Sequence, residues 1–155
     1  NCRRAAQSRA PRPWRVWSGA GAFGDTNRLA EEAMDAAGLV HRRERIAATL
    51  SHGEQRQLEI AMCLATQPRV LLLDEPLAGM GQQESQTIIE LILQLAPDHA
   101  IMLIEHDMDA VFAVAQRLTV MVNGEVIESG APAEVRDSPL VQQAYLGEGH
   151  GAPHG

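Results

Sequence analysis

Residues 50–57 read Leu-Ser-His-Gly-Glu-Gln-Arg-Gln, and residues 70–76 read Val-Leu-Leu-Leu-Asp-Glu-Pro. The first stretch predicts the start of a helix, because Ser51 is a favourable N-cap residue and Glu54 completes a capping box. The remaining backbone N–H groups and the positive end of the helix dipole favour an anion there. Gly53 has no side chain and would let that anion approach the backbone closely. This stretch therefore predicts a helix start that binds phosphate.

The second stretch predicts a buried strand that ends in two carboxylates. Its near-continuous apolar run is typical of a parallel sheet that is buried on both faces. Ligands of such sheets bind at the carboxyl ends of the strands, which is where Asp74 and Glu75 fall. Together with the phosphate-binding helix start, these acids indicate a site for nucleotide phosphate and a divalent metal.

In this order, the two stretches resemble the signature motif and the Walker B strand of ATP-binding cassette (ABC) ATPases. The resemblance rests on Leu50, Ser51, Gly53, Glu54, Arg56 and the Leu-Leu-Leu-Asp-Glu-Pro run at 71–76. Either motif alone would equally fit an ordinary capped helix or a core strand with solvated acids. The two motifs together, at this spacing, favour the ABC family.

The composition places one strong restriction on this interpretation. All 13 basic residues are arginines, so the chain has no lysine for the phosphate-binding loop G-x-x-x-x-G-K-[ST]. We therefore expect the chain to be a fragment that holds only the later part of a nucleotide-binding domain. Its apolar runs are too short to span a membrane, its basic start is not a signal peptide, and Cys2 and Cys63 lie far apart. A reduced, cytoplasmic protein fits these features best.

The pattern along the chain predicts an α/β fold with a mostly parallel sheet and right-handed crossovers. We expect a basic linker or disordered end at 1–25, a helical subdomain with the signature motif at 26–67, the C-terminal part of the ATPase core at 68–147, and a disordered tail at 148–155. Helices are expected from Asn27, from Glu54 to Ala65 and from Gln82 to Leu95. A second buried strand is expected at 100–104. Asn123-Gly124 predicts a hairpin turn between strands at 118–122 and 125–129, and short helices follow.

The buried faces of these helices can also be predicted from the spacing of apolar residues. For the signature helix this gives Leu58, Ala61, Met62 and Ala65. For the helix from Gln82 it gives Ile88, Leu91, Ile92 and Leu95. Arg42, Arg43 and Arg45, which precede the signature motif, are expected to form a solvated face or to pair with a partner protein.

His106 lies just past the second strand, on the edge where Asp74 and Glu75 are expected. Taken alone, a histidine here reads as a structural residue at a helix start, with Asp107 as the N-cap. With the two upstream motifs present, His106 resembles the switch histidine of ABC ATPases, which contacts the γ-phosphate of ATP.

Within the family, the chain most resembles the ATP-binding subunit of branched-chain amino acid importers. Subunits of urea importers and of the lipopolysaccharide exporter are similar enough to remain alternatives. The loop after Pro76 departs from the commoner family pattern because it lacks an Asp, but this Ala-Gly form is common in the branched-chain group. The segments that carry this resemblance are Leu58-Glu59-Ile60-Ala61, Leu77-Ala78-Gly79-Met80, Ile104-Glu105-His106-Asp107-Met108 and Ala144-Tyr145-Leu146-Gly147.

The resemblance implies a role for each motif residue, with ATP and Mg²⁺ as cofactors. Asp74 would hold Mg²⁺ through water, Glu75 would act as general base or orient the attacking water, and His106 would contact the γ-phosphate. Ser51, His52, Gly53 and Glu54 of the signature motif would bind the ATP that the opposite subunit holds.

The implied partners follow from the same family. They are a second nucleotide-binding subunit, membrane-spanning permease subunits and, indirectly, a periplasmic binding protein, whereas nucleic acid is not expected. The subunit would lie peripherally on the cytoplasmic face of the inner membrane.

Without the lysine loop, this chain alone is expected to hydrolyse little or no ATP. A non-catalytic module that completes a partner's ATP site is the alternative. A chromosome-maintenance or DNA-repair ATPase is disfavoured because no sustained heptad run is present.

Overall fold

The computed structural model describes residue 2 and residues 20–148, which fall into two compact units, Asn1–His106 and Asp107–Gly155. The first unit contains the helices α2 (Ala20–Ala36), α3 (His52–Leu64) and α4 (Gln82–Leu95), two 3-10 turns, η1 (Val40–Arg42) and η2 (Ala47–Thr49), and the strands β1 (Val70–Asp74) and β2 (Ala100–Ile104). The predicted segment before residue 20, apart from Cys2, and the predicted tail beyond residue 148 lie outside the described residues. No helix in the described part is long and apolar enough to cross a membrane.

The strands β1 and β2 form the predicted parallel pair, with Leu72 opposite Met102 and Asp74 opposite Ile104. Because the strands run in the same direction, their carboxyl ends meet at one edge. The expectation that both faces are buried is wrong for this unit. Leu71 and Leu73 are buried, but Leu72 is 72% exposed on the opposite face. The helices of the first unit therefore cover one face of this strand pair.

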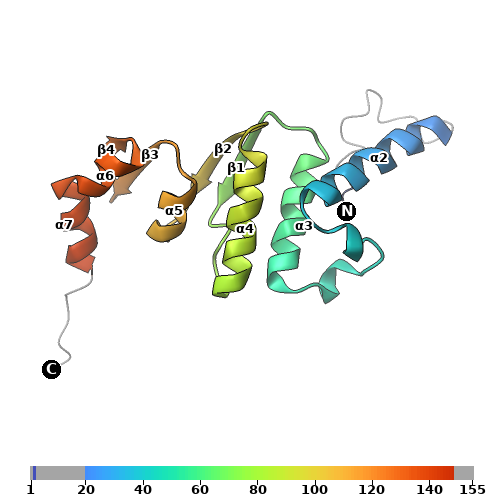
Figure 1. The fold of residues 1–155 in the computed structure, drawn as a ribbon, viewed down its shortest axis with the longest axis horizontal. Coiled ribbons are helices and arrows are strands. Elements are labelled where there is room, and N and C mark those ends of the chain that lie inside the picture. Colours follow the sequence, from blue (N-terminus) through green and yellow to red (C-terminus); the bar gives the residue numbers. More distant parts are fainter. Residues whose placement is uncertain (1, 3–19, 149–155) are drawn as a thin grey trace. The chain divides into compact units, whose positions relative to one another are not determined.

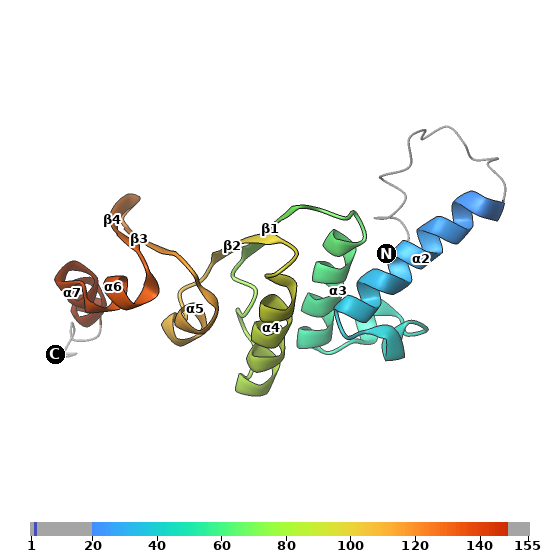
Figure 2. The ribbon, with the colours of Figure 1, turned by 45° about the horizontal axis from the view of Figure 1, so that its top comes forward.

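The helices α3 and α4 run side by side and in the same direction, so both begin at the same end of the unit (Figures 1 and 2). The predicted buried face of α4, with Ile88, Leu91, Ile92 and Leu95, is confirmed. In α3 the prediction was partly wrong: Ala61 and Ala65 are buried, but Leu58 and Met62 are only half-buried. Ile60 and Leu64 complete the buried side of α3 instead.

Two helix starts also differ from the predictions. The helix α2 begins at Ala20 rather than near Asn27, and α3 begins at His52 rather than Glu54. The helix α2 ends at Ala36, two residues before a glycine. Gly38 has a φ of +71°, and the N–H of Leu39 donates to the carbonyl of Met34 at 2.7 Å. Leu39 is buried, so the chain turns back at this glycine and packs against the helix that it has just left.

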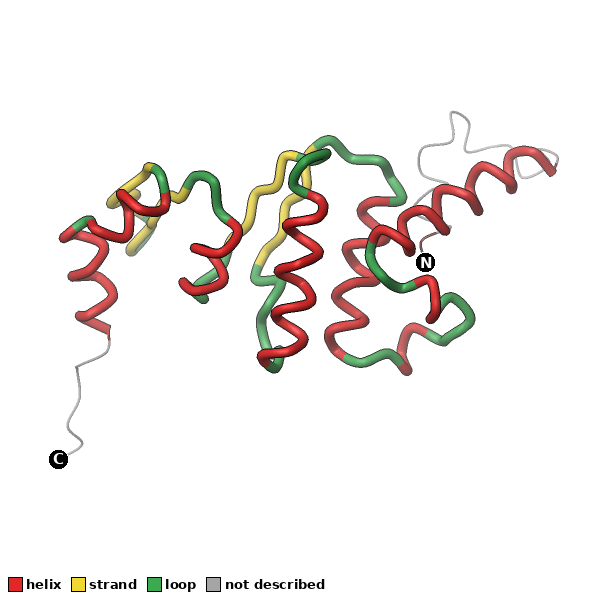
Figure 3. Tube along the Cα trace, in the orientation of Figure 1, coloured by secondary structure: helices red, strands yellow, loops and turns green. Residues whose placement is uncertain are grey.

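The second unit contains a β-hairpin, formed by β3 (Leu118–Val122) and β4 (Glu125–Gly130), and the short helices α5 (Met108–Val114), α6 (Pro132–Asp137) and α7 (Pro139–Glu148) (Figure 3). The helices α6 and α7 pack against the hairpin. The strands β3 and β4 are antiparallel, as expected. Asn123 and Gly124 both have positive φ angles, +51° and +82°, which is the geometry of a type I′ turn. The small core of this unit consists of Val120, Val135 and Val141.

Candidate functional site

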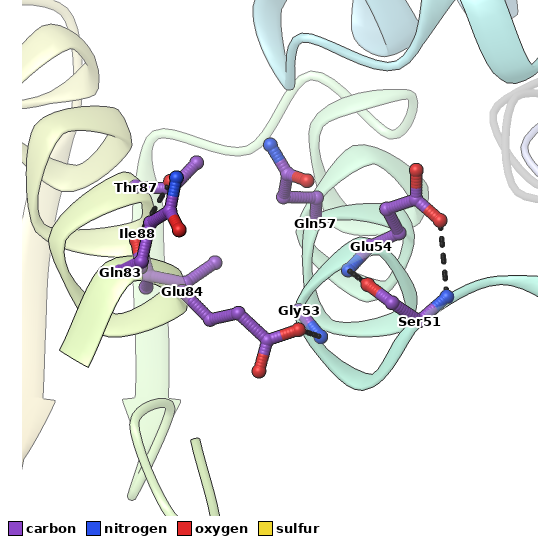
Figure 4. Close-up of a pocket in the computed structure, with 8 residues that line it drawn as sticks. All are labelled: Ser51, Gly53, Glu54, Gln57, Gln83, Glu84, Thr87 and Ile88. Atoms are coloured by element: carbon purple, nitrogen blue, oxygen red, sulfur yellow. Dashed lines mark hydrogen bonds between the residues drawn. The ribbon is translucent and has the colours of Figure 1, made fainter. Parts of the chain in front are cut away.

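The start of α3 forms the capping box that the sequence predicts. Ser51 is the N-cap, and its Oγ accepts a hydrogen bond from the N–H of Glu54 at 3.3 Å. In return, the Glu54 carboxylate accepts from the N–H of Ser51 at 3.0 Å (Figure 4). Two of the N–H groups at this helix start are thus occupied by the chain's own side chains.

Arg42 joins this capping box. Its Nε lies 2.6 Å from Oε1 of Glu54, and the two side chains are 37% and 20% exposed. Arg42 pairs with Glu54 within the chain, so the expectation that it belongs to a solvated face is wrong. The pKa of Glu54 is lowered from its ordinary value, first by the hydrogen bond from the Ser51 backbone and then by the Arg42 guanidinium. Both donors favour the ionised carboxylate.

Gly53 is in contact with a second carboxylate, which the sequence analysis did not single out. The N–H of Gly53 donates to Oε1 of Glu84 at 3.2 Å, and Glu84 lies in the first turn of α4. A Cβ atom at position 53 would lie only 3.1 Å from this oxygen, so a larger residue there would have to displace the Glu84 side chain. The predicted anion preference of Gly53 is thus met here by a carboxylate. A cavity of about 210 Å³ adjoins this contact, lined by residues that include Ser51, Gln57, Glu84 and Thr87.

The ends of β1 and β2 bring together the predicted strand-end residues. The N–H of Glu75 donates to the carbonyl of Ile104 at 2.9 Å, which extends the pairing of the strands beyond Asp74. Oε1 of Glu75 lies 3.7 Å from Nδ1 of His106, and the two side chains are 54% and 77% exposed. The prediction that His106 lies on the same edge as Asp74 and Glu75 is confirmed. Asp107 caps α5, as predicted, by accepting from the N–H of Ala110 at 3.2 Å.

Glu75 has an unusual backbone. Its φ is +42°, in the left-handed region that residues with a side chain seldom adopt. The turn that follows is closed by a hydrogen bond from the N–H of Ala78 to the carbonyl of Glu75 at 3.2 Å. The chain thus reverses sharply at Glu75, at the carboxyl edge of the strand pair.

Glu105 is a further residue of this edge to which the sequence analysis gave no role. Its side chain is only 1% exposed, and its Oε1 accepts from the N–H of Leu77 at 2.8 Å. The sequence contains one indication of a role for Glu105, because this acidic residue directly follows a strand and directly precedes His106. It could not show that this side chain turns inward, because that depends on a loop that begins 28 residues earlier.

The donor set at the strand ends fits a magnesium ion better than a metal held by protein alone. Among the described residues, no group of three or more His, Cys, Asp and Glu side chains could hold a metal. Asp74 stands exposed beside Glu75 at the strand end. Mg²⁺ typically takes one or two carboxylates and completes its shell with water and substrate phosphates.

The signature residues and the strand-end residues form two separate groups. The ring of His52 lies beside Gly79, with Cε1 3.7 Å from the position of a Cβ there. Within the described ranges, no hydrogen bond or ion pair joins Ser51, His52, Gly53 or Glu54 to Asp74, Glu75 or His106.

Comparison with known proteins yields two family matches. The ABC transporter family matches residues 4–78, and the branched-chain amino acid ATP-binding cassette transporter family matches residues 125–151. The chain is 43% identical over 130 residues to the high-affinity branched-chain amino acid transport ATP-binding protein LivG of Salmonella typhimurium, a match that covers 78% of this chain and 51% of LivG. It is 41% identical over 117 residues to the high-affinity branched-chain amino acid transport ATP-binding protein BraF of Pseudomonas aeruginosa. That match covers 74% of this chain and 46% of BraF. The chain thus spans about half the length of these relatives.

A solved structure agrees with this assignment. MJ1267, an ATP-binding cassette of an ABC transporter, superposes with a TM-score of 0.71 at 30% identity, over 78% of this chain and 50% of that one. The signature helix, the parallel strand pair and the hairpin unit thus form part of a P-loop nucleoside triphosphatase fold. The chain belongs to the ATP-binding domain family of ABC transporters.

Proposed function

We propose that the chain is the later part of the ATP-binding subunit of an ABC importer, and that its strand-end residues serve ATP hydrolysis. The observation that carries this proposal is the separation of 3.7 Å between the Glu75 carboxylate and the His106 imidazole, beside Asp74 at the carboxyl edge of a parallel strand pair. Ligands of open α/β sheets bind at this edge. The similarity to ABC transporter proteins supports the same conclusion.

Each residue would contribute to hydrolysis in a distinct way. Asp74 would hold Mg²⁺ through water, and the metal would supply the neutralisation of phosphate charge. Glu75 would accept a proton from the attacking water or orient it, while His106 would donate a hydrogen bond to the γ-phosphate. Both side chains are exposed enough to reach a bound nucleotide. Phosphoryl transfer depends mainly on such positioning and on charge stabilisation.

The signature residues would serve a different ATP molecule. Ser51, His52, Gly53 and Glu54 would contact the γ-phosphate of ATP held by a second ATP-binding subunit. The match of residues 4–78 to the ABC transporter family supports this proposal. We further propose that permease subunits and, indirectly, a periplasmic binding protein are partners, and that the subunit works on the cytoplasmic face of the inner membrane.

Branched-chain amino acids are the proposed cargo. The support comes from the family match at residues 125–151 and from relatives such as LivG and BraF, which are named for high-affinity branched-chain amino acid transport. Uptake of radiolabelled leucine by cells that carry or lack the gene tests this part. Unchanged leucine uptake in cells that lack the gene would contradict it.

The hydrolysis proposal is tested with the complete ATP-binding subunit that contains these residues. Glu75→Gln should lower the rate of ATP hydrolysis by roughly 10²- to 10⁴-fold, while ATP still binds. Glu90→Gln is the matched control, because Glu90 is exposed on α4 and accepts only from Gln86 of the same helix in the described contacts. Equal rates in the wild type and in Glu75→Gln would rule out the assigned role of Glu75.

A second function is favoured by one observation, the complete absence of lysine. A chain without a phosphate loop would serve as a non-catalytic module that supplies its signature helix to a partner's ATP site. In that case the chain would stimulate the partner's ATP hydrolysis, and the stimulation would survive Glu75→Gln. Loss of stimulation in that variant would favour the hydrolytic role instead.

A further inference from the structure

Glu105 is a buried carboxylate at the carboxyl edge of β2 that the proposed mechanism does not use. Its side chain is 1% exposed, whereas that of the neighbouring His106 is 77% exposed. A buried charge is costly unless hydrogen bonds compensate it. Glu105 receives two such bonds from backbone N–H groups, from Leu77 at 2.8 Å to Oε1 and from His106 at 3.2 Å to Oε2.

These two bonds reach both segments that carry the proposed hydrolytic residues. Leu77 lies two positions after Glu75, and His106 directly follows Glu105. On the other side of Glu75, its own N–H is bound to the carbonyl of Ile104, the residue before Glu105. The left-handed backbone of Glu75 is therefore fixed from both sides by two successive residues of the β2 end.

We infer that Glu105 is a positioning residue, which sets the separation between the Glu75 carboxylate and the His106 imidazole by binding the backbone of both segments. This inference rests on the proposed function, because it assigns Glu105 to the same hydrolytic site. The Glu105 carboxylate acts through the other two residues. Without it, the turn after Glu75 loses its link to the strand end and the left-handed backbone loses one of its restraints.

The contact itself is tested by amide hydrogen exchange in the 155-residue chain. In Glu105→Ala, exchange at the Leu77 amide should accelerate by about tenfold or more, because a hydrogen bond to a charged acceptor is lost. Exchange at Leu103 in β2 should stay unchanged. Glu105→Gln should give a smaller acceleration at Leu77, because the amide oxygen of glutamine can still accept from the N–H of Leu77. The bond from the N–H of His106 is lost in this variant, since the NH₂ group cannot accept a hydrogen bond. Unchanged exchange at Leu77 in Glu105→Ala would overturn the inference.

The positioning role is tested by kinetics in the complete ATP-binding subunit. For Glu105→Gln we expect kcat for ATP hydrolysis to fall by about tenfold per folded site, with the KM for ATP within about twofold of the wild type. Glu105→Ala should lose more, and Glu90→Gln should match the wild type. Thermal unfolding of each variant gives the folded fraction. A purely structural role would lower stability and leave kcat per folded site unchanged, which would overturn the inference.

The two tests also separate this inference from the proposed function. A wild-type subunit that hydrolyses no ATP would overturn the proposed function and the kinetic role of Glu105 with it. The Leu77 exchange experiment would still decide whether Glu105 holds the turn. Accelerated exchange together with a lowered kcat and an unchanged KM supports both.

Discussion

Glu54 combines two contacts that differ in how easily the sequence reveals them. Its capping-box bonds with Ser51 are local, so their spacing of three residues was enough to predict them. Its ion pair with Arg42 crosses 12 positions and depends on how the 3-10 turns fold back, so the sequence did not show it. The same distinction applies to Glu84 and Glu105, whose partners lie 31 and 28 residues away.

The lowered pKa of Glu54 leads to a prediction for the dependence of stability on pH. A carboxyl group with a lowered folded-state pKa contributes stability above its unfolded-state pKa, near pH 4, and loses it as the pH falls through the folded-state value. Acidification from about pH 7 to about pH 3 should therefore cost the wild type more of its free energy of unfolding than it costs Glu54→Gln. Urea unfolding at both pH values measures the difference.

The control for this pH experiment is Glu90→Gln, which should lose as much stability on acidification as the wild type. An equal loss in Glu54→Gln and in the wild type would show that the capping box and Arg42 do not stabilise the charged form.

At the scale of the elements, α3 and α4 are in close contact at Gly53 and Glu84. An alanine there would bring its Cβ within 3.1 to 3.2 Å of Oε1, Cβ and Cδ of Glu84, and the Cβ of Glu84 cannot move without its helix. We expect Gly53→Ala to lower the free energy of unfolding by about 1 kcal/mol, because the overpacking outweighs the gain in helix propensity. Thermal or urea unfolding measures this.

Two variants make this prediction sharper. Gly24→Ala, in α2, meets no heavy atom within 4 Å and should raise stability by about 0.5–1 kcal/mol through helix propensity alone. In a Glu84→Ala background the cost of Gly53→Ala should shrink, because the crowded side chain is gone. The same cost in both backgrounds would exclude Glu84 as its cause.

The hairpin of the second unit gives a prediction that concerns the backbone alone. Gly124 has a φ of +82°, and a Cβ there would meet nothing within 4 Å. Gly124→Ala should therefore lower stability by about 1 kcal/mol, because a side chain is disfavoured in this conformation and no contact changes. A loss of stability in Gly124→Ala with a gain in Gly24→Ala, by chemical unfolding, would agree. A gain in both would contradict the assigned turn.

The elements also show where the sequence pattern was sufficient. The parallel pair, the hairpin around Asn123 and Gly124, and the buried face of α4 follow from apolar runs and turn residues, so they were predicted correctly. The start of α2 was not, because Ala20 and its neighbours carry little periodic signal. The apolar run of β1 suggested burial on both faces, whereas Val70 and Leu72 are 55% and 72% exposed.

At the scale of the molecule, the exposed apolar face of β1 and β2 agrees with a chain that spans about half the length of its relatives. Val70, Leu72, Met102 and Ile104 have the composition of interior residues. The prediction of a sheet buried on both faces is therefore wrong for the face that carries these four residues.

The absence of lysine gives the prediction for the molecule as a whole. The purified 155-residue chain should release no phosphate from ATP above background, because no lysine can reach the β- and γ-phosphates. A coupled phosphate-release assay measures this, with Glu75→Gln as the matched control. Turnover by the wild-type chain that disappears in Glu75→Gln would contradict the prediction.

The hydrogen bond from Gly53 to Glu84 affects how tightly an anion could bind at the start of the signature helix. An N–H group that is open to solvent gains a phosphate by giving up water. The N–H of Gly53 already donates to the Glu84 carboxylate, so a phosphate could accept from it only by displacing that carboxylate. The affinity for phosphate would then reflect the difference between the binding free energies of the phosphate and of the carboxylate at this N–H. The exchanged carboxylate belongs to α4, so the same event would release one link between the signature helix and the helix that follows the Walker B strand. If the proposed phosphate contact at the signature helix is made, it would thus be linked to the packing of α3 against α4 through the N–H of Gly53.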